Sequence, residues 1–244
     1  MEKEGPNHTA AAGRLFLIPS PLGENDPGEV IPAPVLELLQ KIRVYVVEEV
    51  RTVRRYLSRA GLKGRIDSLS FHVLNEHTSQ QEVEAMLSLF DGATDVAYIS
   101  EAGLPAVADP GAQLVALCHR HGIEVVPLVG PSSLMLALMA SGLNGQRFAF
   151  CGYLPAKPEE RRSAIREREK HSAACRETQL FIETPYRNDA LLQDLLAVCR
   201  DSTRLTLAAD ITLPTQWIRT QTVRQWKAVR PVIGKRPCVF LLLA

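Results

Sequence analysis

Residues 95–111 read DVAYISEAGLPAVADPG, and this stretch decides the fold class. Its apolar run, 96–99, predicts a buried strand that stops abruptly in a loop containing Gly103, Pro105 and Pro110. In open α/β sheets, ligands bind just beyond the carboxyl ends of such strands. The segment therefore predicts one wall of a binding site.

Strand-like runs and helix-like stretches alternate on both sides of this segment. In the first half we expect strands at 14–18, 44–47, 68–71, 96–99 and 124–126, and helices at 33–41, 51–60, 79–90, 111–121 and 132–141. Such alternation is typical of βαβ units around a mostly parallel sheet. The residues GLNGQR at 142–147 indicate a turn or linker. We therefore expect an N-terminal α/β domain over 14–142 and a C-terminal α/β domain over 143–244.

The second half predicts fewer helices. Strands are expected at 148–150, 179–182, 204–208 and 238–243, with helices at 158–170 and 191–198. The helix at 158–170 carries both signs of charge, from Arg161, Arg162, Arg166, Arg168 and Lys170 and from Glu159, Glu160, Glu167 and Glu169. We interpret it as a solvated helix face, and a contact with RNA phosphates is the alternative.

The bulk composition excludes several classes of protein. A formal net charge of +1 over 244 residues gives no overall attraction to nucleic acid or to an anionic membrane. The five cysteines are far apart, which favours reduced cytosolic thiols over disulfides or a zinc site. No apolar run reaches the roughly 18 residues of a membrane span. The polar stretch 1–13 does not resemble a signal peptide, and we interpret it as a loose tail.

Two polar clusters follow strands of the first half. Glu48-Glu49-Val50-Arg51 ends the second strand, where two adjacent carboxylates indicate either a site or a helix start, because acids favour a helix N-terminus. His72 lies near Asn75 and Glu76 after the third strand. An imidazole can act as a base near neutral pH, although ordinary loop chemistry is the alternative.

Two further loops have both structural and functional interpretations. The first strand runs into PSPLGE at 19–24 instead of a glycine-rich dinucleotide motif, which indicates a structural turn or a ligand contact. In ETPYR at 183–187, Pro185 suits the first turn of a helix. Glu183 ends a strand that faces the expected crevice between the domains, so it is also a candidate site residue.

Taken in chain order, these loops form a series. It comprises LFLIPSPLG at 15–23, EEVR at 48–51, SFHVLNE at 70–76, SEAGLPAVADPG at 100–111, VPLVGPSS at 126–133, SGL at 141–143, FCGYLP at 150–155 and ETPYR at 183–187. The ordered set resembles the tetrapyrrole methylase superfamily, from about residue 14 to the end of the chain. Within it, the chain is most similar to the branch that methylates a cytidine ribose 2′-hydroxyl in small-subunit ribosomal RNA.

The resemblance implies a fold, a cofactor and partners. We expect an α/β fold of two α/β domains of the tetrapyrrole methylase type, with an S-adenosyl-L-methionine cleft between them. The resemblance also implies a cytoplasmic homodimer that acts on ribosomal RNA or the small ribosomal subunit. The residues implied as cofactor contacts are Pro21 and Gly23 at the entrance, Gly103, Leu104, Pro105 and Val107 on one wall, Ser132 and Ser133 opposite, and Leu154, Thr184, Ala209 and Pro237 from the second domain.

The chemistry of methyl transfer selects candidates for catalysis. A ribose hydroxyl is a poor nucleophile, so a proton acceptor should assist it. The candidates are Glu101, Glu49, His72 and Glu183, and Glu101 is favoured because its loop should bracket the cofactor.

Phosphates of the substrate would suit Arg51 and Arg187. No metal is required by this chemistry. Two alternatives stay open: a methyltransferase for a small molecule such as a tetrapyrrole, and a cofactor-binding paralogue with altered or lost activity.

Overall fold

The computed structural model describes residues 13–244, which fold as two units. The first unit ends at Pro131 and the second runs from Ser132 to Ala244. The boundary expected at 142 therefore lies before helix α6 (Ser133–Ser141) rather than after it. The reason is packing, because α6 contacts strands of the second sheet and its Ser141 carbonyl accepts a hydrogen bond from Thr220 Oγ1 at 2.7 Å. Of the polar stretch 1–13 that we interpret as a tail, residues 1–12 lie outside the described residues.

The first unit contains a five-stranded sheet in which all neighbours are parallel, as predicted. In spatial order its strands are β3 (Ser70–Val73), β2 (Val44–Val47), β4 (Val96–Ile99), β1 (Leu15–Leu17) and β5 (Val125–Pro127). The strands expected at 44–47 and 96–99 have the predicted bounds. The third strand begins two residues later than expected, at Ser70.

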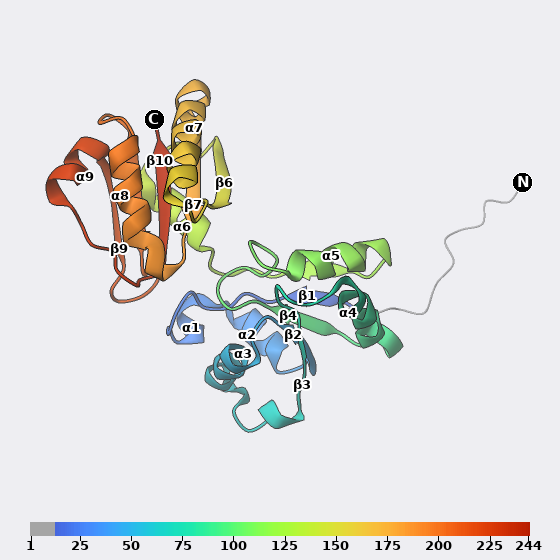
Figure 1. Cartoon of the computed structure of the whole chain (residues 1–244). Coiled ribbons are helices and arrows are strands. Elements are labelled where there is room, and N and C mark those ends of the chain that lie inside the picture. Colours follow the sequence, from blue (N-terminus) through green and yellow to red (C-terminus); the bar gives the residue numbers. More distant parts are fainter. Residues whose placement is uncertain (1–12) are drawn as a thin grey trace, which may run out of the picture. The chain divides into compact units, whose positions relative to one another are not determined.

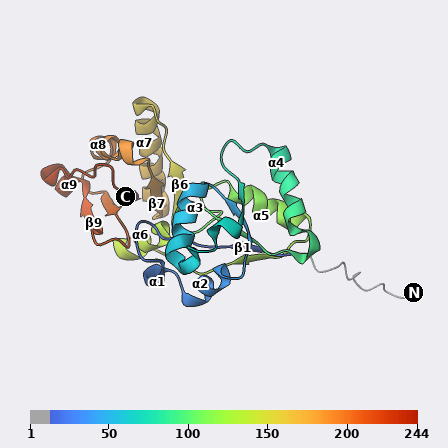
Figure 2. The same cartoon turned by 90° about the horizontal axis from the view of Figure 1, so that it is seen from below.

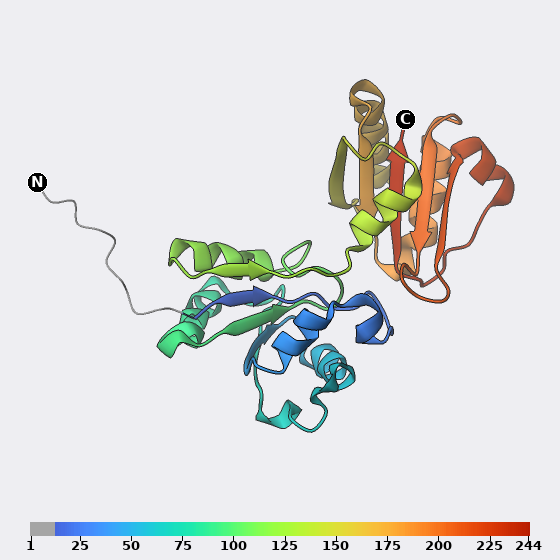
Figure 3. The ribbon, with the colours of Figure 1, turned by 180° about the vertical axis from the view of Figure 1, so that it is seen from behind.

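Helices cover both faces of this sheet. They are α1 (Pro27–Val30), α2 (Ala33–Leu39), α3 (Val50–Leu57), α4 (Gln80–Ala85) and α5 (Gly111–Arg120), with short helical turns η1 (Ser58–Leu62), η2 (Ile66–Ser68) and η3 (Met86–Ala93). Figures 1 and 3 show α2 and α3 on one side of the sheet and α5 on the other. Helix α4 lies beside α5 (Figure 2). An apolar core lies on each face of the sheet, one under α2 and α3 and the other under α4 and α5. Successive residues of a strand point alternately into one core and then the other.

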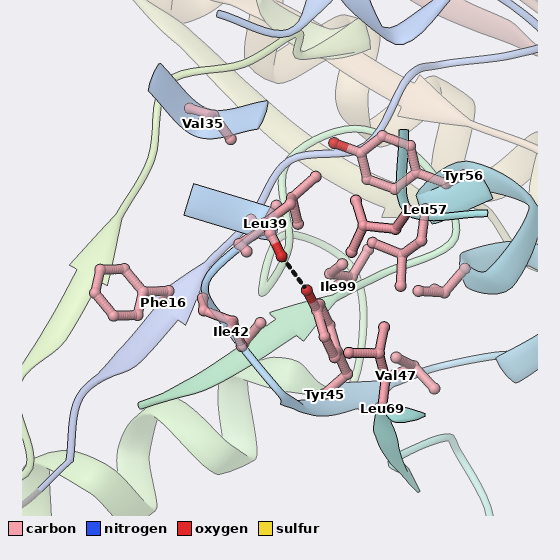
Figure 4. Packing of buried hydrophobic residues seen from close by; sticks show 14 of the residues in the cluster. Phe16, Val35, Leu39, Ile42, Tyr45, Val47, Tyr56, Leu57, Leu69 and Ile99 are labelled. Carbon is pink, nitrogen blue, oxygen red and sulfur yellow. Dashed lines mark hydrogen bonds between the residues drawn. The ribbon is translucent and has the colours of Figure 1, made fainter. Parts of the chain in front are cut away.

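The core under α2 and α3 also holds two buried tyrosines. Tyr45 donates its hydroxyl proton to the carbonyl of Leu39 at 3.0 Å, so β2 is tied to the end of α2 (Figure 4). Tyr56 of α3 donates to the carbonyl of Pro19 at 3.1 Å. Burial raises the pKa of both hydroxyls, so they stay protonated donors. Helix α3 is thereby held against the loop that follows β1.

The start and the end of helix α4 follow from local sequence. Ser79 and Glu82 form a capping box at its start: the Ser79 amide donates to Glu82 Oε2 at 2.7 Å, and the Glu82 amide donates to Ser79 Oγ at 3.4 Å. The helix predicted over 79–90 changes to the tighter turn η3 at Met86. The chain then leaves helical geometry at Asp91, and the next residue, Gly92, has a φ of +64°, which suits glycine.

The second unit has a mixed five-stranded sheet. Its order is β6 (Phe148–Tyr153), β7 (Thr178–Ile182), β10 (Cys238–Leu243), β8 (Arg204–Ala209) and β9 (Trp217–Thr222). Strands β6 and β7 are parallel, and the other neighbours are antiparallel. Strand β9 was not predicted, because WIRTQT at an edge of the sheet has too few apolar residues to show a clear alternation.

Helices also cover both faces of the second sheet. They are α6, already placed, α7 (Pro158–Cys175), α8 (Asn188–Val198) with the preceding turn η4 (Pro185–Arg187), and α9 (Val223–Val229), which the sequence analysis did not predict. Side chains of α7, α8 and α9 share one core, which includes Ile165, Leu191 and Trp226. Helix α6 lies on the opposite face, toward the viewer in Figure 3.

The charged helix α7 is not simply a solvated face, which corrects the sequence analysis. Arg161 is buried and contacts Asp194 of α8 through Nε at 2.7 Å and Nη2 at 2.6 Å. Arg162 reaches the other oxygen of Asp194 at 2.7 Å. Glu169 is also buried, where it accepts hydrogen bonds from the Thr203 hydroxyl and, at 2.8 Å, from the Arg200 amide. These charges join α7 to α8 and to the loop before β8.

The cysteines of this fold are unpaired thiols. All five are free, and burial raises the pKa of Cys118 to about 11 and of Cys199 and Cys238 to about 12. These three thiols therefore stay protonated at neutral pH. Within residues 13–244, no helix has both the length and the apolar character to cross a membrane.

Candidate functional site

The loops that follow β1, β4 and β5 meet at the carboxyl edge of the first sheet. Ser20 and Gly103 exchange two backbone hydrogen bonds, of 3.0 Å and 3.1 Å, which join the loop after β1 to the loop after β4. A Cβ atom added to Gly130, after β5, would lie 2.2 Å from Cβ of Pro19. This edge is where ligands of parallel α/β sheets bind.

Asp109 holds the loop at 100–111 in a curved shape. Its Oδ1 accepts hydrogen bonds from the Tyr98 hydroxyl at 2.9 Å, from the Ala106 amide at 3.1 Å and from the Gly111 amide at 2.8 Å. Ala106 and Ala108 have φ values of +64° and +63°, which cost roughly 1–3 kcal/mol each for such residues. Backbone strain of this kind persists where the surroundings over-determine it, and it clusters at functional sites.

The loop also presents polar atoms that have no hydrogen-bond partner among the described residues. Ser100 Oγ and Asp109 Oδ2 are both buried and unpartnered. Leaving such an atom unpaired costs about 1–3 kcal/mol, so each one calls for a bonding group from outside the chain. A polar ligand at this edge of the sheet would supply that group.

The expected cofactor residues of the first unit all lie on these loops. Pro21, Gly103 and Pro105 are buried, Gly23 and Leu104 are half-buried, and Val107 is exposed. At Gly103, φ is +78° and an added Cβ would lie 3.1 Å from Leu22 Cδ2. A residue with a side chain would therefore be both strained at this φ and crowded against Leu22, so the position favours glycine.

Glu48 is a carboxylate that the sequence analysis did not single out from its motif. It directly follows β2, and its Oε2 accepts a hydrogen bond from the Glu101 amide at 3.2 Å. Burial raises the pKa of Glu48, and the negative charges of Glu101 and Asp109 raise it further. The sequence did contain a signal for this role, because Glu48 is the first acidic residue after a buried strand. Glu101 itself is exposed at the same edge of the sheet.

Glu49 has a structural role at the start of α3. Its carboxylate accepts hydrogen bonds from the Arg51 amide at 3.0 Å and from the Thr52 amide at 2.6 Å. These bonds lower the pKa of Glu49 below its usual range. An ionised carboxylate with its lone pairs engaged in this way is a weak proton acceptor. The alternative interpretation of this acid, as a helix start, matches the contacts.

His72 lies within β3, at the edge of the sheet. Its Nε2 is 2.9 Å from the hydroxyl of Ser70, which is nearer the amino end of the same strand. No hydrogen bond joins His72 to Glu48, Glu101 or Asp109 in the part of the chain that the structure describes. The structure therefore does not bring this imidazole into the group of carboxylates.

The cofactor contacts expected from the second unit share one edge of the second sheet. Strand β10 is antiparallel to β7 and β8, so Cys238 at its start pairs with Ala209 at the end of β8. Tyr153 pairs with Ile182 at the ends of β6 and β7. As a result, Leu154, Thr184, Ala209 and Pro237 follow or end strands at the same edge. The side chains of Leu154 and Ala209 are buried, whereas Thr184 and Pro237 are exposed.

Glu183 and Arg187 contact each other at that edge. Glu183 Oε1 accepts hydrogen bonds from Arg187 Nε at 2.9 Å and Nη2 at 2.5 Å, and from the Thr184 amide at 2.7 Å. The candidate base and the candidate phosphate ligand thus form one ion pair, with the carboxylate side chain fully buried. Glu183 Oε2 is buried and has no partner among the described residues.

The two serines expected to hold the cofactor begin α6. Ser132 is its N-cap, and the Ser132 hydroxyl accepts a hydrogen bond from the Met135 amide at 3.4 Å. Ser133 is the first helical residue.

Residues 13–244 contain no group of three or more His, Cys, Asp or Glu side chains arranged to hold a metal ion.

Comparisons with known proteins agree with this geometry. The profile of tetrapyrrole (corrin/porphyrin) methylases matches residues 29–226. The ribosomal RNA small subunit methyltransferase I of Escherichia coli O157:H7 is 34% identical over 200 residues, which are 82% of this chain and 66% of that protein. The protein of that name from Haemophilus influenzae is 30% identical over 237 residues, 96% of this chain and 80% of that protein. The chain thus spans just under two thirds of the E. coli relative.

Solved structures share the fold. The methyltransferase CobJ has a TM-score of 0.64 at 18% identity, with 95% of this chain and 94% of that chain covered. Uroporphyrin-III C-methyltransferase from Thermus thermophilus, complexed with S-adenosyl homocysteine, has a TM-score of 0.58 at 20% identity, with 95% and 97% covered. The two α/β units, the ordered loops and the profile match together assign the chain to the tetrapyrrole (corrin/porphyrin) methylase family, to which it belongs.

Proposed function

We propose that this protein is an S-adenosyl-L-methionine-dependent methyltransferase that methylates a ribose 2′-hydroxyl in small-subunit ribosomal RNA. The observation that carries the proposal is the strained loop at 100–111, which Asp109 holds at the carboxyl edge of a parallel sheet. The buried, unpartnered Ser100 Oγ and Asp109 Oδ2 fit a polar cofactor there. The relatives named as ribosomal RNA small subunit methyltransferases supply the substrate class.

The cofactor would be held chiefly by the backbone of this loop. Gly103, Leu104, Pro105 and Val107 provide the wall, and Pro21 and Gly23 lie on the loop that is hydrogen-bonded to it. When bound, the sulfonium supplies an activated methyl group, so the protein mainly contributes orientation and electrostatics. The contacts assigned to Ser132, Ser133, Leu154, Thr184, Ala209 and Pro237 stay predictions.

The proton of the ribose hydroxyl would pass to Glu101. This carboxylate is exposed at the edge where the cofactor would bind, and its amide is tied to Glu48. Glu48, whose pKa is raised by burial, would orient the Glu101 backbone. Glu49, His72 and Glu183 are engaged in the contacts described above, so Glu101 is the acceptor that we propose.

The cofactor site is tested by two substitutions at one position. Asp109→Ala removes the acceptor of three hydrogen bonds and should weaken S-adenosyl-L-methionine binding at least tenfold by calorimetry. Asp109→Asn keeps an oxygen in the Oδ1 position and with it the shape of the loop, so it should bind more tightly than Asp109→Ala. Equal affinity for the parent and Asp109→Ala would contradict the assignment. A parent that fails to bind at high micromolar concentrations would refute the proposed function itself.

The substrate is tested by methyl transfer to small-subunit RNA from a strain that lacks this gene. The parent should incorporate methyl groups at one ribose, and Glu101→Gln should lower the rate by roughly 10²–10⁴ with unchanged cofactor affinity. Methylation of a porphyrinoid with RNA inert would instead identify a small-molecule enzyme. Cofactor binding without turnover on either substrate would identify an inactive paralogue.

We also propose that the protein is a cytoplasmic homodimer, as expected for the family and for a ribosomal substrate. Exposed apolar side chains of the second unit support an interface between copies: Met135 and Met139 on α6, and Phe148, Phe150 and Tyr153 on β6. Sedimentation analysis at micromolar concentration tests this proposal. A monomer under those conditions would contradict it.

A further inference from the structure

Helix α3 presents a row of arginines on one side. Arg51 and Arg55 of α3 and Arg59 of the following turn η1 are spaced four residues apart, and Arg54 follows Arg51 by three, which places the four side chains on one side of the helix. The opposite face of α3 buries Val53, Tyr56 and Leu57 in the core. The arginines line a groove of about 740 Å³, together with Glu24, Glu49, Val50, Ser58 and Ile66. We call this the α3 groove.

The α3 groove contains uncompensated positive charge. The guanidinium groups of Arg51 and Arg55 form no hydrogen bond or ion pair with any of the described residues. Arg54 and Arg59 pair with Asp67 and Glu24, but those carboxylates are 93% and 83% exposed. Exposed pairs of this kind contribute little and exchange readily with other anions.

The row of arginines is unfavourable for the helix itself. Arg51 and Arg55 are four residues apart, as are Arg55 and Arg59, and like charges at this spacing destabilise a helix. Four residues rise about 6 Å along a helix, which resembles the separation of neighbouring phosphates in an extended strand. Guanidinium groups bind phosphate oxygens in a fixed, often bidentate geometry. The row therefore suits a polyanion with regularly spaced charges.

The α3 groove also begins beside the proposed reaction site. At the amino end of α3, the groove is lined by Glu49 and Arg51. These residues come directly after Glu48, whose carboxylate accepts a hydrogen bond from the Glu101 amide. The Tyr56 hydroxyl ties α3 to the loop after β1 at Pro19. Helix α3 is thus fixed to two of the loops that carry the proposed cofactor and base. A strand held in the groove would lead directly to that edge of the sheet.

We propose that the α3 groove binds the sugar-phosphate backbone of the RNA substrate next to the target nucleotide, with Arg51 and Arg55 each contacting a phosphate. This inference rests on the function proposed above and extends it from Arg51 alone to the whole row. The phosphate charge would replace Asp67 and Glu24 as the partner of Arg54 and Arg59. The groove would hold RNA without reading its sequence, because phosphate contacts carry no base information.

The experiment compares the full-length parent with Arg51→Gln/Arg55→Gln. The probe is a fluorescein-labelled, mixed-sequence single-stranded RNA of twelve nucleotides, followed by fluorescence anisotropy over a range of salt concentrations. We expect the double variant to bind at least tenfold more weakly. The slope of log affinity against log salt should fall by about 1.4 in magnitude, because each phosphate contact with single strands contributes about 0.7. Arg51→Lys/Arg55→Lys should restore most of the slope.

A matched control removes the same charge elsewhere. Arg166 and Lys170 are exposed on α7, also four residues apart, and form no hydrogen bond or ion pair within the described chain. Arg166→Gln/Lys170→Gln should leave RNA affinity and the salt slope unchanged. Both double variants should keep the parent's affinity for S-adenosyl-L-methionine and should melt at or above the parent's melting temperature, which shows that they are folded.

The outcomes separate this inference from the proposed function. If the parent binds and methylates RNA but Arg51→Gln/Arg55→Gln keeps its affinity and slope, the groove assignment is wrong and the proposed function stands. An equal loss in the α7 control would also refute the groove, because the effect would then reflect net charge. If the parent neither binds nor methylates RNA, both the groove and the ribosomal function fail.

Discussion

Helices α3 and α7 are both rich in arginine, but their arginines have opposite environments. On α7, Arg161 and Asp194 are each only 5% exposed and contact each other at 2.6 Å. On α3, Arg51 and Arg55 are exposed and have no partner in the described chain. The same residue type therefore joins two helices in one unit and leaves charge available for a ligand in the other.

The difference shows that an arginine's role depends on what the fold packs against it. The guanidinium of Arg161 is neutralised because α8 brings Asp194 to it inside the protein. Removing one partner of a buried pair leaves an unpaired charge, which is far more costly than losing an exposed pair. Three measurements test this contrast between buried and exposed charge.

The largest effect is expected at Asp194. Asp194→Ala leaves the buried Arg161 without its carboxylate and should lower the free energy of unfolding by about 3–5 kcal/mol. Urea denaturation followed by tryptophan fluorescence measures this, because Trp217 and Trp226, the chain's two tryptophans, are both in the second unit. Asp201 pairs with Lys227 and Arg224 in the same unit but is exposed, so Asp201→Ala is the control and should leave the midpoint nearly unchanged. Equal effects at the two positions would remove the contrast.

A smaller effect is expected at the other buried charge of α7. Glu169→Ala leaves the Arg200 amide and the Thr203 hydroxyl without their acceptor, which should cost about 1–3 kcal/mol. Glu169→Gln keeps an oxygen acceptor at the same place and should lose less than half as much in the same fluorescence assay. If both variants are equally destabilised, the negative charge rather than the hydrogen bonds stabilises this junction.

The smallest effect is expected at an exposed pair of the first unit. Arg14 donates to Asp95 through Nη2 at 2.8 Å, and this bond holds the pKa of Asp95 below its usual range. Because the pKa is lower in the folded state, the stabilisation is present at neutral pH and is lost as the pH falls through the folded-state value. Asp95→Asn should therefore cost less than about 1 kcal/mol at pH 7.

The difference between Asp95→Asn and the parent should then shrink as the solution is acidified. Thermal unfolding followed by far-ultraviolet circular dichroism at pH 7 and at pH 3 checks this. A difference that persists unchanged at the lower pH would mean that the aspartate acts through packing rather than through its charge.

Individual elements show how far the sequence predicts the structure. The strands at 44–47, 96–99 and 238–243 were predicted with their observed bounds, because continuous apolar runs bounded by turns are strong local signals. Strand β9 was missed because half-exposed edge strands show little periodicity. Helix α6 was predicted at 132–141 but was assigned to the wrong domain, because the strands it packs against, β9 and β10, lie far along the chain.

The sequence by itself determined the α/β class, the parallel first sheet, the family and the loops that gather at strand ends. These follow from local hydrophobic runs and from ordered motifs, which act over a few residues. Only the tertiary structure decided how charged side chains are used. It paired Glu183 with Arg187, assigned Glu49 to cap α3 and buried Arg161 against Asp194. The physical reason is that a charge's energy depends on burial and on partners from distant segments, which the order of residues does not state.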